Sequence, residues 1–346
     1  MSTKKADYIS NISKKKIANN KTIDKYLAIE NEKKANALAF CFNKFYAEKY
    51  KHKTNELEKF KSRPLTTCKN KFCHICSYIK SKKTFVKTYQ AIEDMRNDNI
   101  DFIAYHLTLT IKNPYTFDLE SAYNTMNKAF HNFIHKFKEL NNYTIGWQVG
   151  REISQSAQAR NNNEFHPHLH CLLLLKPEFY NPTNRTQKIT KAEFRERWKK
   201  SCEHYNIEAY QIEFKKIKAK ADYINLEIDD GEIDPFLSAI SEVAKYPTKP
   251  ADIQKMSVEH FEILDRVMHG KRQTSTGGLL KKYIGFNSDN EILHINNWEL
   301  VEVLFCEYNK RYSVKTLDNE EFNNYVINKE IDIREYNNAV WDKLVK

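Results

Sequence analysis

Apolar and polar residues alternate along the middle of the chain with a period of two, which is typical of half-buried strands. In FIAYHLTLTIKN, the apolar side chains from Ile103 to Ile111 fall on one face, and His106, Thr108 and Thr110 fall on the other. Similar alternation marks YTIGWQVGREI (143–153), FHPHLHCLLLL (165–175) and AYQIEFKKI (209–217). The pattern therefore predicts four strands.

Helical periodicity separates these strands. Apolar residues recur every three or four positions between Ala122 and Phe137, and Thr190 with Glu193 forms a capping box that predicts a second helix start. The resulting order, βαββαβ, is the split βαβ arrangement and predicts an α+β fold with an antiparallel sheet backed by helices. Further helices are expected over 22–50, 84–95, 235–246 and 257–269.

The 346 residues carry no internal repeat and no Pro/Gly-rich linker, so domain boundaries depend on changes in pattern. We predict a basic helical region with clustered cysteines at 1–98, an α+β domain at 99–275 and a C-terminal region at 276–346. The last of these contains no chemistry that the sequence assigns.

Charge and composition narrow the class of partner. Forty-one per cent hydrophobic residues provide for a real core, and the net charge of +11 favours a polyanion, most often a nucleic acid. The chain shows no signal-peptide pattern, and its longest apolar run, CLLLL, is too short to span a bilayer. We therefore expect a cytoplasmic protein with no membrane partner.

Three histidines share one face of the strand at 165–175. Residues two apart on a strand point the same way, so His166, His168 and His170 lie together, and Glu152 occupies the polar face of the preceding strand. Burying several imidazoles is costly unless they are solvated, paired or ligated. A hairpin would bring Glu152 beside them and complete a divalent-cation site; a purely structural role for the histidines is the alternative.

The HPHLH motif within an apolar strand resembles the metal-binding signature of the HUH endonucleases. Within that superfamily, the chain resembles the rolling-circle replication initiators (Rep) of small bacterial plasmids over roughly residues 65–285. The resemblance rests on LTLT (107–110), FHPHLHCLLLL and EVAKYPTK (242–249), in that order, and on the upstream cysteines. It implies an HUH-type sheet and a nickase that depends on Mg²⁺ or Mn²⁺ and becomes attached to DNA through a tyrosine.

The same resemblance assigns residues to roles. It implies that His168 and His170 are metal ligands, with Glu152 the third and His166 either a further ligand or a neighbour of the ion. In EVAKYPTK, it implies that Tyr246 is the nucleophile and that Glu242 activates water at termination. These two residues are four apart, although Pro247 disfavours helical geometry at Tyr246. The candidate DNA-binding residues are Lys245, Lys249, Lys112 and Arg151.

The cysteines predict a second metal site. The spacing of Cys68, Cys73 and Cys76 is typical of three of the four ligands of a zinc site. Cys41 is the candidate fourth ligand, with His74 or His52 as substitutes. A structural Zn²⁺ would hold this basic segment in shape and present it to DNA. Reduced thiols on a basic loop are the alternative. Cys171, Cys202 and Cys306 are expected to be core residues.

Together these features predict a metal-dependent nickase and strand-transfer enzyme that initiates plasmid replication. Its expected partners are single-stranded and origin DNA, together with a host helicase and polymerase. Two alternatives stay open: another HUH enzyme, either a transposase or a relaxase, and a non-catalytic DNA-binding protein stabilised by metal. The sequence leaves the nick site, the physiological metal and the oligomeric state undecided.

Overall fold

The computed structural model describes residues 3–54, 58–181, 183, 186–217, 235–245, 248, 250–286, 298–309, 311–326 and 328. The chain divides into two compact units. The terminal unit comprises residues 1–20, 33–68 and 291–346, and the central unit comprises residues 21–32 and 69–290. Within the described ranges, the helices are too short or too polar to cross a membrane.

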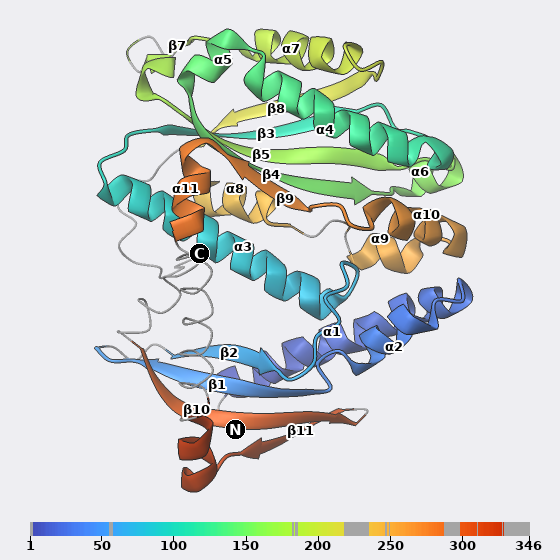
Figure 1. Ribbon diagram of the computed structural model, residues 1–346, viewed down its shortest axis with the longest axis vertical. Coiled ribbons are helices and arrows are strands. Elements are labelled where there is room, and N and C mark those ends of the chain that lie inside the picture. The colour runs from blue at the N-terminus through green and yellow to red at the C-terminus, as the bar shows by residue number, and fades with distance from the viewer. Residues whose placement is uncertain are drawn as a thin grey trace, which may run out of the picture. The chain divides into compact units, whose positions relative to one another are not determined.

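The central unit is built on a five-stranded sheet with the order β8-β3-β5-β4-β9, in which all neighbouring strands are antiparallel (Figure 1). Its strands are β3 (Ile103–Ile111), β4 (Thr144–Ser154), β5 (His166–Leu175), β8 (Ala209–Lys216) and β9 (Thr274–Gly277). A separate pair is formed by β6 (Tyr180–Asn181) and β7 (Thr186–Gln187). The long strand β5 therefore lies at the centre of the sheet.

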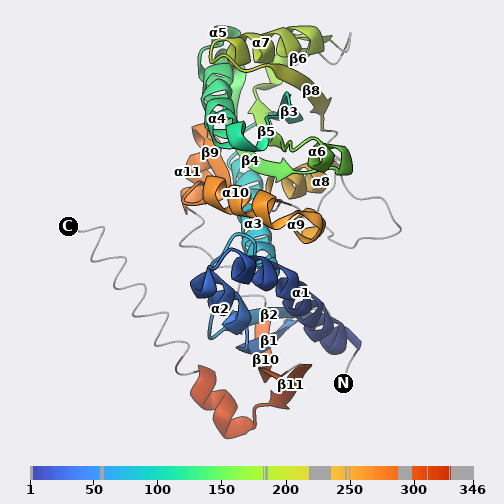
Figure 2. The same cartoon turned by 90° about the vertical axis from the view of Figure 1, so that its right-hand side faces the viewer.

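Helices cover both faces of this sheet. Figures 1 and 2 show α4 (Leu119–His135) and α7 (Lys191–Glu203) on one face, and α3 (His74–Asn97) and α8 (Pro235–Val243) on the other. The remaining helices are α5 (Lys138–Tyr143), α6 (Ala157–Asn161), α9 (Pro250–Lys255), α10 (Val258–Met268) and α11 (Gly278–Phe286), with 3-10 turns η1 (Thr116–Asp118) and η2 (Pro177–Phe179). The predicted capping box is present at the start of α7.

Strand alternation sends two different sets of side chains into two cores. On the α4 side, Phe133 packs edge-on against Trp198, whose indole N–H donates to the Thr110 carbonyl oxygen at 2.9 Å. On the α3 side, Leu172 and Leu174 of β5 join a buried cluster with residues of α3, α8 and α11. Because that second face is also the histidine face, β5 is polar at one end and fully apolar at the other.

The terminal unit contains a four-stranded sheet with the order β11-β10-β1-β2. Its strands are β1 (Lys44–His52), β2 (Glu58–Pro64), β10 (Trp298–Asn309) and β11 (Arg311–Thr316), and the first helices of the chain are α1 (Thr3–Ala28) and α2 (Glu32–Phe40). The helical pattern expected over 22–50 is therefore wrong at residues 44–50. Its cause is non-local: β1 pairs with β10, some 250 residues later, and a bulge at Lys49/Tyr50 breaks the period of two.

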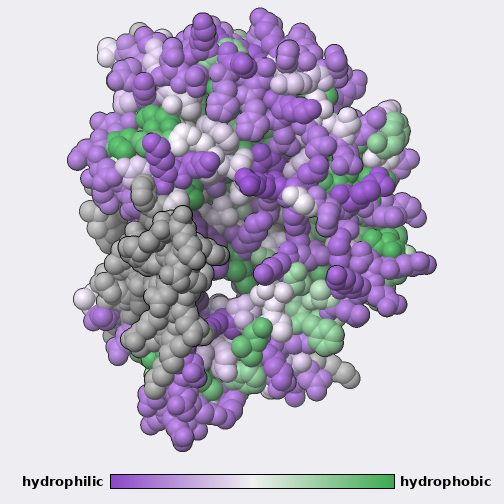
Figure 3. All heavy atoms as spheres, in the orientation of Figure 1, coloured by the Kyte–Doolittle hydropathy of each residue, from purple (hydrophilic) through white to green (hydrophobic). Residues whose placement is uncertain are grey.

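The prediction of an α+β chain with antiparallel sheets and helices is confirmed. The helices expected at 235–246 and 257–269 correspond to α8 and α10. The boundaries 1–98, 99–275 and 276–346 stay predictions, although β1 and β10 join the two ends of the chain in one sheet. On the face shown in Figure 3, hydrophilic residues predominate, as expected for a chain with 29% charged residues.

Candidate functional site

Register within the β4–β5 hairpin places the predicted ligands together. Glu152 lies directly opposite His168, and Gly150 lies opposite His170, so the carboxylate of β4 faces both imidazoles of β5. Side chains that alternate on paired strands reach one another only when the register is correct. The hairpin register is therefore the structural cause of the site.

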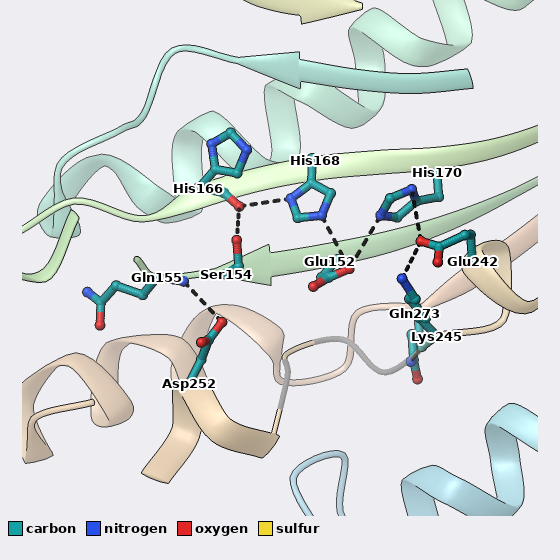
Figure 4. Close-up of polar contacts among 10 residues, drawn as sticks. All are labelled: Glu152, Ser154, Gln155, His166, His168, His170, Glu242, Lys245, Asp252 and Gln273. Atoms are coloured by element: carbon teal, nitrogen blue, oxygen red, sulfur yellow. Dashed lines mark hydrogen bonds and ion pairs between the residues drawn. The ribbon is translucent and has the colours of Figure 1, made fainter. Parts of the chain in front are cut away.

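The three side chains converge on one point, as Figure 4 shows. The Nε2 atoms of His168 and His170 lie 3.2 Å and 3.3 Å from the same carboxylate oxygen, Oε2 of Glu152. All three residues are buried, and their candidate ligand atoms lie within 4.8 Å of one another. Two imidazole nitrogens and one carboxylate oxygen form a donor set that suits a divalent cation.

The ring of His168 has a second contact that prepares it for this role. Its Nδ1 lies 3.1 Å from the backbone carbonyl oxygen of His166, and only a protonated Nδ1 can donate a hydrogen bond there. The assigned tautomer leaves a lone pair on Nε2, the atom that faces Glu152. The strand backbone thus orients this imidazole for ligation.

His166 lies beside this cluster rather than in it. Its Nδ1 is 2.7 Å from the side-chain oxygen of Asn113, and its ring is stacked at a tilt near that of His168, with 5.1 Å between centroids. Figure 4 shows its ring turned away from Glu152. His166 is thus not among the residues whose candidate ligand atoms are grouped, and its role toward the ion stays a prediction.

Helix α8 brings Glu242 to the same place. Its Oε2 lies 3.9 Å from Nδ1 of His170, and its carboxylate also pairs with the Lys245 ammonium. Gly150 makes this approach possible, because an added Cβ would stand only 2.2 Å from the carbonyl oxygen of Val243. The absence of a side chain on β4 therefore lets the end of α8 reach the histidine face.

His106 of β3 also lies at this cluster, although the sequence analysis assigned it no role. Its ring stacks on that of His170 with 5.6 Å between centroids and 10° between planes. Burial, followed by the neighbouring His170, lowers the pKa of His106 to about 4, so its ring is neutral near pH 7. Its place on the polar face of FIAYHLTLTIKN was visible in the sequence, but its stacking partner required the register of β3 and β5.

The remaining predicted catalytic and DNA-binding residues have different outcomes. Tyr246 and Lys249 lie outside the described residues. Lys245 pairs with Glu242, and its backbone carbonyl oxygen accepts a hydrogen bond from Gln273 Nε2 at 2.6 Å. Lys112 is solvent-exposed and forms a 2.9 Å ion pair with Glu208, so it remains accessible to a phosphate.

The DNA contact predicted for Arg151 stays a prediction, but its side chain lies inside the fold. It is buried, and its guanidinium donates hydrogen bonds to the side-chain oxygens of Asn127 and Ser275. The physical reason is the alternation of side chains along a strand. Arg151 directly precedes Glu152 on β4, so its side chain points to the opposite face of the sheet. Burial also lowers the pKa of this guanidinium. We assign it a structural role between β4, α4 and β9.

The four candidate zinc ligands form no disulfide bonds, and neither do the other three cysteines. Cys73 caps the N-terminus of α3, and its Sγ accepts from the backbone N–H of Cys76 at 3.5 Å. Cys73 and Cys76 belong to the central unit, whereas Cys41 and Cys68 belong to the terminal unit. Cys171, Cys202 and Cys306 are buried, as expected for core residues, and burial raises the pKa of Cys202 to about 12.

The chain shares sequence with known proteins over most of its length. A family model described as "Replication protein" matches residues 59–321. "Protein rep" of Streptococcus pneumoniae serotype 2 is 25% identical over 237 residues, which are 68% of this chain and 66% of that protein, just under two thirds of its length.

Two further relatives have similar sequence identity to this chain. "Protein rep" of Lactiplantibacillus plantarum is 26% identical over 251 residues, covering 70% of this chain and 72% of that protein. A "Replication protein" of Staphylococcus aureus is 24% identical over 234 residues, covering 64% of this chain and 88% of that protein. No solved structure matches the chain.

Proposed function

Since the chain belongs to the replication protein family of plasmid rolling-circle initiators, we propose that it nicks one strand of a plasmid origin. The cut would yield a 5′-phosphotyrosyl link on the protein and a free 3′-hydroxyl, from which a host polymerase extends while a host helicase opens the duplex. The observation that carries this proposal is the convergence of Glu152, His168 and His170 beside Glu242.

The first requirement is a divalent cation, Mg²⁺ or Mn²⁺, at the three converging residues. A carboxylate that is 2% exposed fits such a site, because a bound cation balances the charge that burial would otherwise make costly. When bound, the ion would polarise a phosphate oxygen and stabilise the charge that develops on it. His168 and His170 would supply nitrogen ligands, and Glu152 would supply the oxygen.

The protein's own residues supply the remaining chemistry. The Tyr246 phenolic oxygen would form a bond to phosphorus as the bond to the 3′-oxygen breaks, and the phenolic proton would pass to the medium while the leaving oxygen gains one. Lys245 and Lys249 would hold neighbouring phosphates. The role of Tyr246 rests on the family resemblance and on its place one residue after Lys245, whose backbone carbonyl is held by Gln273.

Glu242 has a separate proposed role at termination. Its carboxylate lies near His170 and is half-buried, so a water molecule beside the phosphotyrosyl link could lose a proton to it. Hydrolysis would then replace a second tyrosine transfer. We expect Glu242→Ala to nick DNA and accumulate adduct, but to release it slowly; a variant with normal release would remove Glu242 from this step.

The zinc site is proposed for the four cysteines Cys41, Cys68, Cys73 and Cys76, each of which offers the thiolate ligand that Zn²⁺ prefers. We expect one equivalent of zinc in the purified protein, measured by mass spectrometry under native conditions. Its loss in Cys73→Ser, with manganese binding retained, would separate the two metal sites. A zinc-free wild-type protein would favour the alternative of reduced thiols.

The central test incubates the protein with pooled single-stranded origin DNA and Mn²⁺ and resolves the products on a denaturing gel. We expect a covalent adduct in the wild type and none in Tyr246→Phe or His168→Ala/His170→Ala. The matched control is His131→Ala/His135→Ala, which removes a stacked pair of histidines from α4 on the opposite face of the sheet.

The outcomes distinguish the alternatives. An adduct that persists in Tyr246→Phe would move the nucleophile to another residue. DNA binding without any adduct would favour the non-catalytic DNA-binding protein. A transposase or relaxase would act at inverted repeats or a transfer origin rather than at a plasmid replication origin, and parallel substrates of each kind would reveal it.

A further inference from the structure

A cavity of about 490 Å³ opens beside the histidine cluster in the central unit. Its wall includes Lys112 after β3, Glu164 before β5, His166 at the start of β5 and Tyr210 on β8. Small-ligand sites typically enclose roughly 300 to 1,000 Å³, so one nucleotide fits this space. The cavity contains none of the three converging metal ligands, and the proposed nicking chemistry does not use it.

Tyr210 gives the cavity an aromatic surface. Its side chain is 71% exposed, although an aromatic ring of this size would gain free energy from burial. Nearby, the exposed rings of Tyr115 and Phe117 stack on each other, and Tyr115 forms a backbone bridge with Glu164. Exposed aromatic rings beside basic residues are typical of surfaces on which unpaired bases stack.

Glu164 gives the cavity a hydrogen-bond acceptor. One of its carboxylate oxygens accepts from the Asn113 amide at 3.3 Å, and Asn113 in turn contacts the His166 ring. A carboxylate can accept a hydrogen bond from the exocyclic amino group of cytosine, adenine or guanine. Thymine has no such group, so the carboxylate favours the other three bases over thymine.

Lys112 supplies a positive charge at the rim. Its ammonium pairs with Glu208 at 2.9 Å, and both side chains are largely exposed. Exposed ion pairs contribute little stability, so a DNA phosphate can replace Glu208 at small cost. The cavity therefore combines a stacking surface, a base-edge acceptor and a phosphate contact.

The position of the cavity relates it to the metal ligands. His166 lines it, and the His166 ring lies 5.1 Å, centroid to centroid, from that of His168. We propose that this cavity holds one unpaired base of the DNA strand, next to the phosphate that would contact a divalent cation held by Glu152, His168 and His170. The base stacks on Tyr210, and Glu164 selects against thymine. This inference rests on the proposed function and adds a specificity site to it.

The test measures binding of fluorescein-labelled (dC)12 and (dT)12 to the full chain in low salt, by fluorescence anisotropy. We expect Tyr210→Ala to weaken (dC)12 binding about tenfold, and Tyr210→Phe to retain it, because base stacking needs only the ring. Phe40→Ala is the matched control, since it removes an exposed aromatic side chain from the terminal unit.

Base selection is tested with the same two probes. We expect the wild type to bind (dC)12 about fivefold more tightly than (dT)12, since a base-edge contact contributes about 1 kcal/mol. In Glu164→Gln, the amide can rotate to donate to thymine O4, so the preference should disappear. Photo-crosslinking with 5-iododeoxycytidine in (dC)12 should map to Tyr210 by mass spectrometry.

Two results would overturn the inference. The first is that the wild type and Glu164→Gln each bind (dC)12 and (dT)12 with equal affinity. The second is that the crosslinks map away from Tyr210 and that Tyr210→Ala binds (dC)12 as tightly as the wild type. The nicking assay reports separately on the proposed function. Crosslinking at Tyr210 without any covalent adduct would reject nicking and keep the base site. Adduct formation with no base preference would keep nicking and reject the base site.

Discussion

The five-stranded sheet and the four-stranded sheet each contain a buried glutamate, and the two glutamates have different consequences. Glu152 on β4 and Glu48 on β1 are 2% and 1% exposed. Glu48 accepts hydrogen bonds from the hydroxyl groups of Tyr50 and Tyr325, at 2.7 Å and 2.6 Å. Glu152 instead faces the Nε2 atoms of two histidines.

The partners decide what each carboxylate can do. The tyrosine hydroxyl groups donate hydrogen bonds to Glu48 and satisfy its carboxylate within the folded chain, so Glu48 stabilises the terminal sheet. In a neutral His168 ring whose Nδ1 donates to the backbone carbonyl, Nε2 carries the lone pair. A lone pair beside a carboxylate favours a cation. Burial of a glutamate therefore indicates function only when its neighbours are ligands.

The largest effect is expected at Glu152, the carboxylate that we propose as a metal ligand. Glu152→Gln should lower the rate of adduct formation with Mn²⁺ about a thousandfold, because metal-assisted charge stabilisation contributes several kcal/mol to the transition state. Thermal unfolding in EDTA should change little, and the stabilisation by added Mn²⁺ should disappear. Glu48→Gln, assayed well below its unfolding temperature, is the matched control and should retain adduct formation. Equal losses of rate in both variants would remove the distinction between the two glutamates.

A smaller loss of rate is expected when the three proposed ligands are unchanged and only the end of α8 beside them moves. Gly150→Ala would place a Cβ 2.2 Å from the Val243 carbonyl oxygen, so the end of α8 must shift away from β4. Misplacing groups by about 1 Å costs roughly a hundredfold in rate, which is the loss we expect in adduct release through Glu242. Mn²⁺ affinity should stay close to that of the wild type. Unchanged release would show that the approach of α8 is unimportant.

The contrast also shows which features the sequence reveals. The central sheet was predictable because its strands alternate cleanly, and HPHLH with a strand-borne Glu152 indicated a ligand set before any geometry was known. The register of β4 and β5 then brought these residues together. His106 was visible on the correct face, but its stacking on His170 depends on pairing between β3 and β5.

The terminal sheet was not predictable from local pattern. In KFYAEKYKH, both Ala47 and Glu48 are buried, so β1 lacks the regular alternation of a half-buried strand. Its partner β10 lies near the other end of the sequence, and Tyr325, which satisfies Glu48, lies farther still. A charged residue in a strand looks like a surface position until a distant donor is known. Arg151 shows the converse, because a basic residue expected on the surface is buried.

A third prediction concerns stability rather than chemistry. Glu48→Gln should lower the free energy of unfolding by about 2 kcal/mol, because a neutral amide accepts less strongly and leaves one buried tyrosine hydroxyl poorly satisfied. Urea denaturation followed by tryptophan fluorescence measures the change. Glu58→Gln on β2, whose carboxylate forms a partly exposed ion pair with Lys49, is the control and should cost much less. Similar losses in both variants would mean that burial of Glu48 adds no stability.

The smallest predicted effect is the pH dependence that the two tyrosines bound to Glu48 contribute. Burial, then Glu48, raises the pKa of both Tyr50 and Tyr325 above the ordinary value of about 10. In the unfolded chain these phenols ionise above that value, whereas in the folded chain they keep their protons, so stability falls as pH rises beyond about 10.

Between pH 10 and pH 11, each of the two tyrosines should lower the free energy of unfolding by about 1 kcal/mol. In Tyr325→Phe the contribution of Tyr325 should be absent. Tyr210→Phe is the control, because it removes a phenol that is exposed in the folded chain and lies away from Glu48. Denaturant midpoints of the three proteins at the two pH values measure the difference. A wild-type loss no larger than that of Tyr325→Phe would mean that Glu48 does not hold this phenol neutral.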